Sequence, residues 1–151
     1  MEKRVFVIGV FDLMHRGHLE LLRRAKELGT ILVVGINSDV KVASYKRKPY
    51  LNENERLEVV EALKYVDVAF IMNDTLQREN ISKYNINVIV HGDDWPEELY
   101  LKHIGLDREY LEKNNIELKM LPHTEGISTS DIIKRIKSEL EIELKNKYVL
   151  L

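Results

Sequence analysis

Two histidines lie three residues apart near the start of the chain, in the stretch GVFDLMHRGH at residues 9–18. An imidazole can bind a metal ion, serve as a structural side chain, or donate hydrogen bonds to phosphoryl oxygens. A zinc site is disfavoured, because it needs a third and a fourth ligand and the chain has no cysteine to supply one. Packing or helix capping by His15 and His18 stays open, and so does a site that holds a phosphate chain for attack.

The segments around this stretch predict an α/β fold. Continuous apolar runs predict strands over residues 4–10, 30–36, 66–71, 88–91 and 117–121, and helical spacing of apolar residues predicts helices over 17–28, 54–63 and 76–84. Strands that are apolar throughout and alternate with helices indicate a parallel sheet covered on both faces. We therefore expect a Rossmann-like, doubly wound parallel five-stranded sheet, in a single domain over residues 1–151.

The histidine stretch follows the first predicted strand. Open parallel sheets bind ligands beyond the carboxyl ends of their strands. Gly9 and Gly17 would permit close approach of the backbone to a ligand, and the helix that starts near Gly17 would offer unpaired N–H groups to an anion. His15 and His18 would then donate hydrogen bonds at the entrance of this helix.

Two segments lie outside this alternating pattern. Residues 95–115 are charged and helical in character, without a strong strand pattern, and we expect them to pack beside the sheet. After the fifth strand, residues 124–131 lead into a helix in which Ile132, Ile133 and Ile136 repeat at helical spacing and Ser and Thr supply the N-cap. The last residues, NKYVLL, could fray or dock.

Composition excludes several classes of function. The 151 residues include 23 basic and 25 acidic side chains, so no overall charge attracts the chain to nucleic acid or to an anionic membrane. The absence of cysteine excludes disulfides and thiol catalysis. The first apolar run is too short and polar for a signal peptide or a spanning helix, and residues 138–147 lack a wide apolar face. We expect a cytoplasmic protein without membrane association.

Five ordered motifs resemble a known family. GVFDLMHRGH, NENER at 52–56, YVD at 65–67, HGDDW at 91–95 and TEGISTSDI at 124–132 resemble the cytidylyltransferases of the nucleotidyltransferase superfamily that carries the HxGH motif. HGDDW is most similar to the glycerol-3-phosphate enzymes, and NENER and EGISTSDII are equally similar to the choline-phosphate and ethanolamine-phosphate enzymes. The resemblance runs from about residue 4 to residue 137.

The resemblance implies transfer of a cytidylyl group from CTP to a phosphorylated small alcohol, with glycerol 3-phosphate as the expected acceptor. It implies Mg²⁺ bound with CTP, held mostly by substrate oxygens and water, and a homodimer. It implies catalytic roles for His15, His18 and Lys46. The nucleotide-binding residues that it implies are Gly9, Val10, Phe11, Gly17, Arg56, Gly92, Asp94, His123, Thr124, Gly126, Ile127, Ser128 and Thr129.

Each of these roles has a structural alternative. Residues 46–48, KRK, could be a solvated loop, and the alignment of Lys46 is uncertain by one position. Arg56 could be an ordinary exposed arginine of a helix, paired with its neighbour Glu53 or Asn52. Trp95 is expected to pack, and the TEGISTSD segment could be an ordinary N-cap as well as a phosphate cradle. Asp12 could hold its loop by hydrogen bonds or approach a metal.

The chain departs from the family pattern at two positions. His123 stands where the family usually has arginine before TEGIS, and Lys64 stands where the glycerol-phosphate enzymes carry arginine before YVD. Neither residue offers the permanent planar fork of arginine. Two other functions therefore stay open: cytidylyl or adenylyl transfer to a different acceptor, such as phosphocholine, phosphoethanolamine or a sugar phosphate, and a nucleotide-binding module whose catalysis has lapsed.

Overall fold

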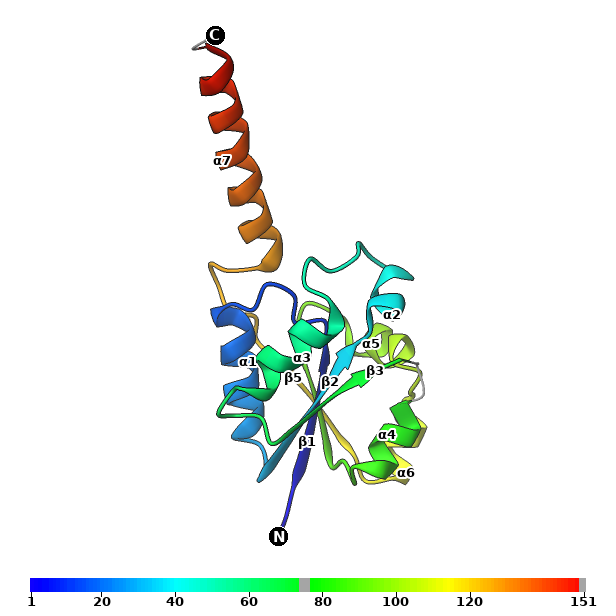
Figure 1. Cartoon of the computed structure of the whole chain (residues 1–151). Helices are drawn as coiled ribbons and strands as arrows, with labels where there is room; N and C mark the ends of the chain where they lie inside the picture. Colours follow the sequence, from blue (N-terminus) through cyan, green and yellow to red (C-terminus); the bar gives the residue numbers. More distant parts are fainter. Residues whose placement is uncertain (74–76, 150–151) are drawn as a thin grey trace.

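A single parallel sheet of five strands organises the chain in the computed structural model, which describes residues 1–73 and 77–149. The strands are β1 (Arg4–Gly9), β2 (Ile31–Asn37), β3 (Val68–Met72), β4 (Val88–Gly92) and β5 (Glu117–Leu121). Their spatial order is β3-β2-β1-β4-β5, and every neighbouring pair is parallel (Figure 1). The sheet grows in one direction from β1 to β3 and in the other from β4 to β5, so the predicted doubly wound α/β fold is confirmed.

Seven helices are found in the described part of the chain: α1 (Arg16–Lys26), α2 (Asp39–Ala43), α3 (Glu53–Glu61), α4 (Gln77–Lys83), α5 (Glu97–His103), α6 (Arg108–Lys113) and α7 (Thr129–Val149). The short helix α2 was not predicted. Residues 95–115 form α5 and α6, joined by a turn. Residue 76, the predicted start of the helix that corresponds to α4, lies outside the described residues.

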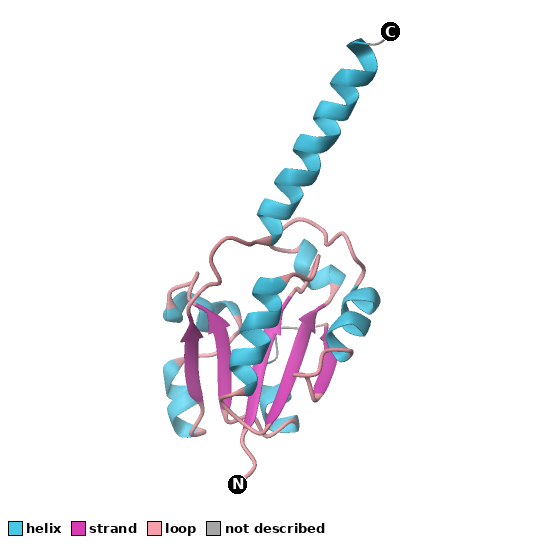
Figure 2. Ribbon diagram, turned by 90° about the vertical axis from the view of Figure 1, so that its left-hand side faces the viewer, coloured by secondary structure: helices cyan, strands magenta, loops and turns pink. Residues whose placement is uncertain are grey.

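The two faces of the sheet are covered by different helices (Figures 1 and 2). Along β1, Phe6 and Ile8 belong to one buried apolar cluster, which includes residues of α4, α5 and α6. Val5 and Val7 belong to the other, which includes residues of α1 and α3. This alternation arises because successive side chains of a strand point to opposite faces. Residues 95–115 thus pack on the sheet, as expected.

The last helix, α7, projects from the domain (Figures 1 and 2). It is 21 residues long and none of its residues is buried. Ile136, Leu140 and Leu144 are all about half exposed and lie four residues apart, so they share one face of the helix. Residues 146–149 of the NKYVLL stretch continue this helix, and residues 150–151 lie outside the described part. No helix among the described residues is long and apolar enough to cross a membrane.

Candidate functional site

The carboxyl ends of β1, β2 and β4 open into a cavity of about 770 Å³. It lies where the strand order reverses, which is the ligand-binding position of doubly wound sheets. All the predicted site residues line it except Arg56, Gly126 and Ile127. Its walls also include residues that the sequence did not point to, namely Asn37, Lys41, Tyr45, Tyr100, His103 and Ile104.

His15 and His18 form the cap of α1 and also face the cavity. The Nδ1 atom of His15 accepts a hydrogen bond from the backbone N–H of Gly17 at 3.0 Å, and the Nδ1 atom of His18 accepts one from the backbone N–H of His15 at 3.2 Å. A ring nitrogen that accepts from a backbone N–H carries no proton, so both neutral rings carry theirs on Nε2. The capping and phosphate-binding alternatives are therefore compatible, because capping fixes each ring with an Nε2 donor.

Burial keeps both imidazoles neutral. It lowers the pKa of His18 to about 4, with smaller contributions from His15 and Lys46 that exceed the opposing effect of Asp12. The pKa of His15 is also lowered, by burial and then by the charge of His123. The two ring centroids are 3.9 Å apart, a distance at which two protonated rings would repel strongly. The pair is thus a set of neutral hydrogen-bond donors.

The loop before α1 is held in an unusual backbone conformation. Phe11 and Leu13 have φ angles of 56° and 48°, in the left-handed region that costs energy for residues with a Cβ atom. A Cβ atom added to Gly17 would lie 2.8 Å from the His15 ring, so only glycine leaves space for that ring. The sequence of this loop is therefore constrained by the placement of the histidines.

Asp12 holds this loop to the chain segment before α3. Its carboxylate accepts hydrogen bonds from the backbone N–H groups of Tyr50 and Leu51, at 2.9 and 3.0 Å, and pairs with Arg47 at 3.3 Å. Burial alone would raise the pKa of Asp12, but these hydrogen bonds outweigh it and lower the pKa. Of the two possible roles of Asp12, the structure supports the loop-holding one.

Within the basic loop, the three side chains differ in their surroundings. Lys46 lines the cavity, and burial and Arg47 lower its pKa against the opposing charges of Asp12 and Asp94. Arg47 also reaches the cavity, but its guanidinium lies on Tyr50 and bonds to Asp12. Lys48 is exposed and does not line the cavity. This placement supports the alignment that assigns Lys46 to the phosphates.

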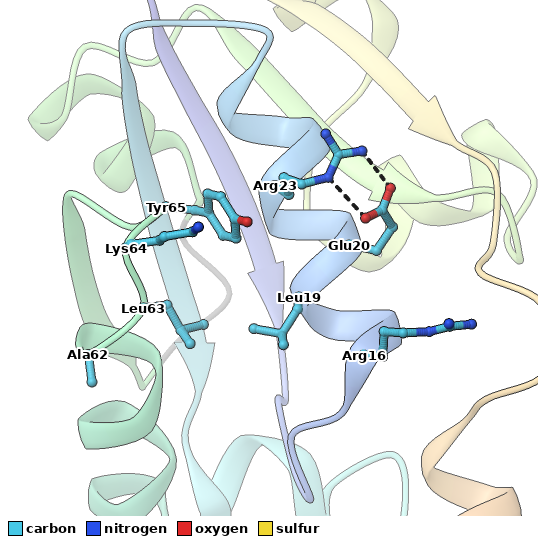
Figure 3. Close-up of a pocket in the computed structure, with 8 residues that line it drawn as sticks. All are labelled: Arg16, Leu19, Glu20, Arg23, Ala62, Leu63, Lys64 and Tyr65. Atoms are coloured by element: carbon cyan, nitrogen blue, oxygen red, sulfur yellow. Dashed lines mark hydrogen bonds and ion pairs between the residues drawn. The ribbon is translucent and has the colours of Figure 1, made fainter.

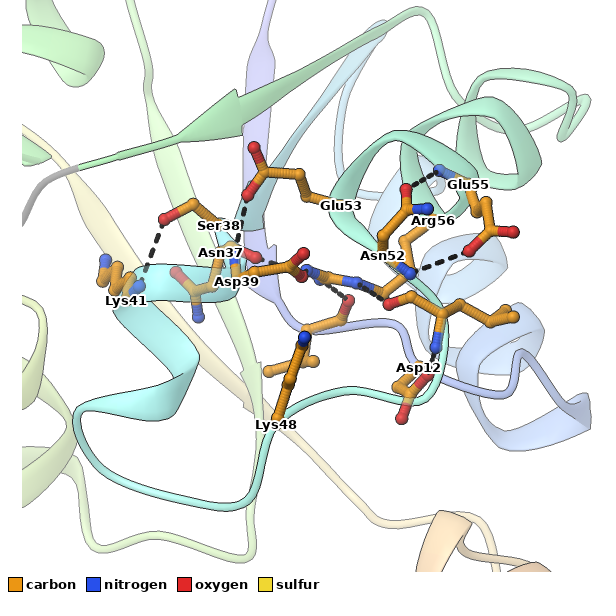
Figure 4. A network of polar contacts seen from close by, with 12 residues as sticks. Asp12, Asn37, Ser38, Asp39, Lys41, Lys48, Asn52, Glu53, Glu55 and Arg56 are labelled. Atoms are coloured by element: carbon orange, nitrogen blue, oxygen red, sulfur yellow. Dashed lines mark hydrogen bonds and ion pairs between the residues drawn. The ribbon is translucent and has the colours of Figure 1, made fainter.

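Arg56 is fully buried, and its predicted contact with the nucleotide or acceptor phosphate is corrected to a positioning role (Figure 4). Its Nε–H donates to Leu51 O at 3.0 Å, and its Nη1 donates to Val10 O at 2.6 Å and to Asn37 O at 3.0 Å. Its Nη2 pairs with Asp39 at 2.7 Å. These bonds use four of the five guanidinium N–H groups, so Arg56 joins the loops after β1 and β2 instead of facing a ligand.

The segment 123–131 brings α7 to the histidines. The backbone N–H of Asp131 donates to Ser128 Oγ at 3.1 Å, so Ser128 caps α7, as the structural alternative predicted. Thr129 Oγ1 lies 3.3 Å from His15 Nε2, which places the N-terminus of α7 beside the α1 cap. Gly126 has a φ angle of 78°. Gly126 and Ile127 do not line the cavity themselves but lie in the turn between two residues that do, Thr124 and Ser128, and their contact with the nucleotide stays a prediction.

The HGDDW segment contributes a glycine, a carboxylate and an aromatic ring to the lining of the cavity. Gly92 and Asp94 line the cavity, and their contact with the nucleotide stays a prediction. Trp95 lines it too, 38% exposed, with its ring 4.9 Å from that of His103, so it packs and also faces the site. Tyr100, in α5, was missed because nothing in a charged helical segment marks one tyrosine as facing a cavity.

Two further lining residues, Asn37 and Tyr45, lie before and after α2 in the chain. Tyr45 OH accepts a hydrogen bond from Asn37 Nδ2 at 3.1 Å, and the Tyr45 ring meets that of His103 at 5.0 Å. The one signal for Asn37 in the sequence is its place at the carboxyl end of an apolar strand. Tyr45 carried no signal, since exposed tyrosines are common in loops.

The two departures from the family pattern differ in position. His123 lines the large cavity and influences His15. Lys64 lies elsewhere, in a cavity of about 420 Å³ between α1 and the end of α3, where its Nζ is 5.1 Å from the centre of the Tyr65 ring (Figure 3). A change at Lys64 therefore does not touch the site, whereas a change at His123 does.

Metal-binding clusters are absent from the part of the chain that the structure describes: no group of three or more His, Asp or Glu side chains there could hold an ion. Two carboxylates, Asp12 and Asp94, line the large cavity among the described residues. Asp12 is already bonded to its own loop, whereas the Asp94 side chain is 58% exposed. This donor set fits Mg²⁺ held by substrate phosphates, water and at most one carboxylate.

Known proteins resemble the chain over most of its length. It is 38% identical over 135 residues to glycerol-3-phosphate cytidylyltransferase of Bacillus subtilis, an alignment that covers 89% of this chain and 97% of that protein. It is 40% identical over 137 residues to ethanolamine-phosphate cytidylyltransferase of Dictyostelium discoideum, covering 88% of this chain but only 36% of that longer protein.

A solved structure and a family profile agree with these relatives. The lipopolysaccharide core biosynthesis protein of Thermoplasma volcanium superposes with a TM-score of 0.66 at 28% identity, over 82% of this chain and 98% of that one. The profile of the family described as cytidylyltransferase-like matches residues 6–135, which include every motif from the histidine pair to the start of α7. The chain therefore belongs to the cytidylyltransferase-like family.

Proposed function

We propose that this protein transfers a cytidylyl group from CTP to the phosphate of a small phosphorylated alcohol, releasing pyrophosphate. The observation that carries the proposal is the convergence, in one cavity, of the His15 and His18 Nε2 donors, the Lys46 ammonium and the N-termini of α1 and α7. All of these groups favour phosphate oxygens. Glycerol 3-phosphate is the proposed acceptor, because the Bacillus subtilis relative of that name matches along almost its whole length.

The chemistry requires no protein nucleophile. A phosphate oxygen of the acceptor attacks the α-phosphorus of CTP, the bond from this phosphorus to the β-phosphate bridging oxygen breaks, and the electron pair leaves with pyrophosphate. Lys46 neutralises charge between the two anions and holds them in line. The Nε2–H groups of His15 and His18 donate to the oxygens on which charge accumulates.

Magnesium is part of the proposal. The ion would neutralise the triphosphate, with Asp94 as the exposed cavity carboxylate able to contribute one oxygen. His123 would bind phosphate less strongly than the arginine of the family, since an imidazole lacks the planar fork with which a guanidinium binds two phosphate oxygens at once.

The test is pyrophosphate release with Mg²⁺, crossing CTP, ATP, GTP and UTP with phosphorylated alcohols, amino alcohols and sugars. Release only with CTP and an acceptor supports the proposal. Phosphoethanolamine is the second candidate acceptor, since the Dictyostelium relative of that name is 40% identical over the matched region. CTP binding without release for any acceptor would instead support a nucleotide-binding module.

A homodimer is also proposed. The half-exposed face of Ile136, Leu140 and Leu144 on α7 supports it, because an apolar face left in water is a common feature of association surfaces. Light scattering after size exclusion is expected to give twice the mass of one chain, and a monomer at micromolar concentration would contradict it. The cytoplasmic location stays a prediction.

A further inference from the structure

One set of residues in the lining of the large cavity is chemically unlike the histidine pair. Asn37, Tyr45, Trp95, Tyr100 and His103 form it, and we call it the aromatic pocket. Its residues come from the end of β2, the loop after α2, and the segment that includes α5, whereas the phosphate donors come from α1 and α7. The rings of Tyr45 and Trp95 both contact that of His103, at 5.0 and 4.9 Å, which joins the two sides of the pocket into one wall.

Two buried polar atoms in this wall have no hydrogen-bond partner among the described residues: Asn37 Oδ1 and Tyr100 OH. Asn37 is 5% exposed and Tyr100 is 2% exposed, and both line the cavity. Leaving such a group unpaired typically costs about 1–3 kcal/mol, so native proteins nearly always satisfy it. A ligand with hydroxyl groups would satisfy both, since a hydroxyl can donate to the amide oxygen and can donate to or accept from the phenol.

The charges around the pocket oppose a cationic ligand. Lys41 and Lys46 line the same cavity, and the charge of Lys41 reaches His103, where it adds to burial in lowering the pKa of that imidazole. Of the described cavity carboxylates, Asp12 is bonded to Arg47 and to backbone N–H groups, and the charge of Asp94 acts on Lys46. Aromatic rings can bind ammonium groups by cation–π contacts, but of the two described cavity carboxylates only Asp94, whose charge also acts on Lys46, could assist them.

We propose that the aromatic pocket receives the alcohol end of the acceptor, and that Asn37 and Tyr100 select a neutral hydroxylated chain, a polyol or sugar phosphate, over an ammonium-bearing one. This inference rests on the proposed function and specifies its substrate class. It assigns specificity to two residues outside every sequence motif of the family resemblance.

The first test is Tyr100→Phe, which removes only the unpaired hydroxyl and preserves the packing of the ring. With glycerol 3-phosphate as the varied acceptor, the KM is expected to rise about tenfold, the effect of losing one hydrogen bond of about 1.4 kcal/mol. The KM for CTP should not change. Tyr110→Phe is the matched control, because that ring packs against the same apolar cluster, beside Arg78, but does not line the cavity.

A substrate without hydroxyl groups separates specificity from a general defect. With propyl phosphate, which keeps the phosphate but lacks both hydroxyls, Tyr100→Phe is expected to leave the KM unchanged. An equal rise with propyl phosphate and glycerol 3-phosphate, or no rise with either, would overturn the assignment of Tyr100.

The second test reverses the charge argument. Asn37→Asp places a carboxylate in the pocket and is expected to raise kcat/KM for phosphoethanolamine relative to glycerol 3-phosphate. If the unmodified protein already used phosphoethanolamine or phosphocholine with higher kcat/KM than every polyol and sugar phosphate, the proposal would be wrong.

Direct binding distinguishes failure of this inference from failure of the proposed function. Calorimetric titration with glycerol 3-phosphate alone needs no turnover, and Tyr100→Phe is expected to weaken that binding about tenfold. Binding with this loss, but no pyrophosphate release, would contradict the proposed function and preserve the pocket assignment. Turnover with an acceptor whose affinity does not depend on Tyr100 would support the proposed function and contradict the pocket assignment.

Discussion

Replacing Arg56 by alanine is expected to destabilise the fold more than it damages nucleotide chemistry directly. The substitution removes four hydrogen bonds. The carbonyl groups of Val10, Asn37 and Leu51 lose this donor, and the Asp39 carboxylate loses its positively charged partner. Breaking a buried ion pair on one side typically costs about 3–5 kcal/mol. Since small domains have about 5–15 kcal/mol of stability in total, Arg56→Ala should lie near the limit of folding.

Arg56→Lys makes the experiment quantitative. Lysine keeps the charge but cannot reach all four acceptors in the geometry of the planar fork, so a loss of about 2–3 kcal/mol is expected from hydrogen bonds to a charged group. Urea unfolding followed by circular dichroism measures both variants, with Arg135→Ala on the exposed part of α7 as control. The reasoning would be refuted by variants that lose CTP binding but keep the free energy of unfolding of the parent within about 1 kcal/mol. Such a result would show that Arg56 contacts a phosphate directly.

Three further predictions concern the histidine pair. His18→Ala should lower kcat by about 10² or more and leave the circular dichroism spectrum intact, because a donor to the transition state is lost; an unchanged kcat would remove His18 from the mechanism. Gly17→Ala should displace the His15 ring, which its Cβ atom would approach to 2.8 Å, and reduce kcat; parental kinetics would show that the ring can move freely. The folded-state pKa of His18 is about 4, below its unfolded value of 6.5, so the free energy of unfolding should fall by up to about 3 kcal/mol as pH drops from about 6.5 towards 4. Urea unfolding at a series of pH values should show a smaller loss in His18→Ala, and an equal loss in both proteins would contradict this.

The sheet could be predicted from the sequence because its central strands are continuously apolar. TILVVGI and VIVH leave no polar face, and such runs are stable only when covered on both sides. Helix α2 could not be found in the same way, since its five residues are too few to show a helical period. Its ends depend on Ser38, whose side chain caps it, and on contacts made only after folding.

The role of Arg56 could not be predicted for a different reason. An arginine within NENER has the same local sequence whether its side chain points to water or inward, and charged side chains are rarely buried. What decides its orientation is the position of three carbonyl groups that lie 5, 19 and 46 residues away along the chain. For the same reason Tyr100, which reaches the cavity only in the folded chain, carried no signal in the sequence, and Asn37 carried only its place at the end of a strand.

The protonation state of the histidines follows from the fold and not from their identity. An isolated histidine has an ordinary pKa near 6.5 and exchanges its proton between two nitrogens. Here two backbone N–H groups of the α1 cap occupy both Nδ1 atoms, and burial disfavours the charged form. The same cap that begins the helix therefore fixes an Nε2–H donor on each ring, that of His15 lying 3.3 Å from Thr129 Oγ1, so a phosphate chain would meet rings that are already oriented.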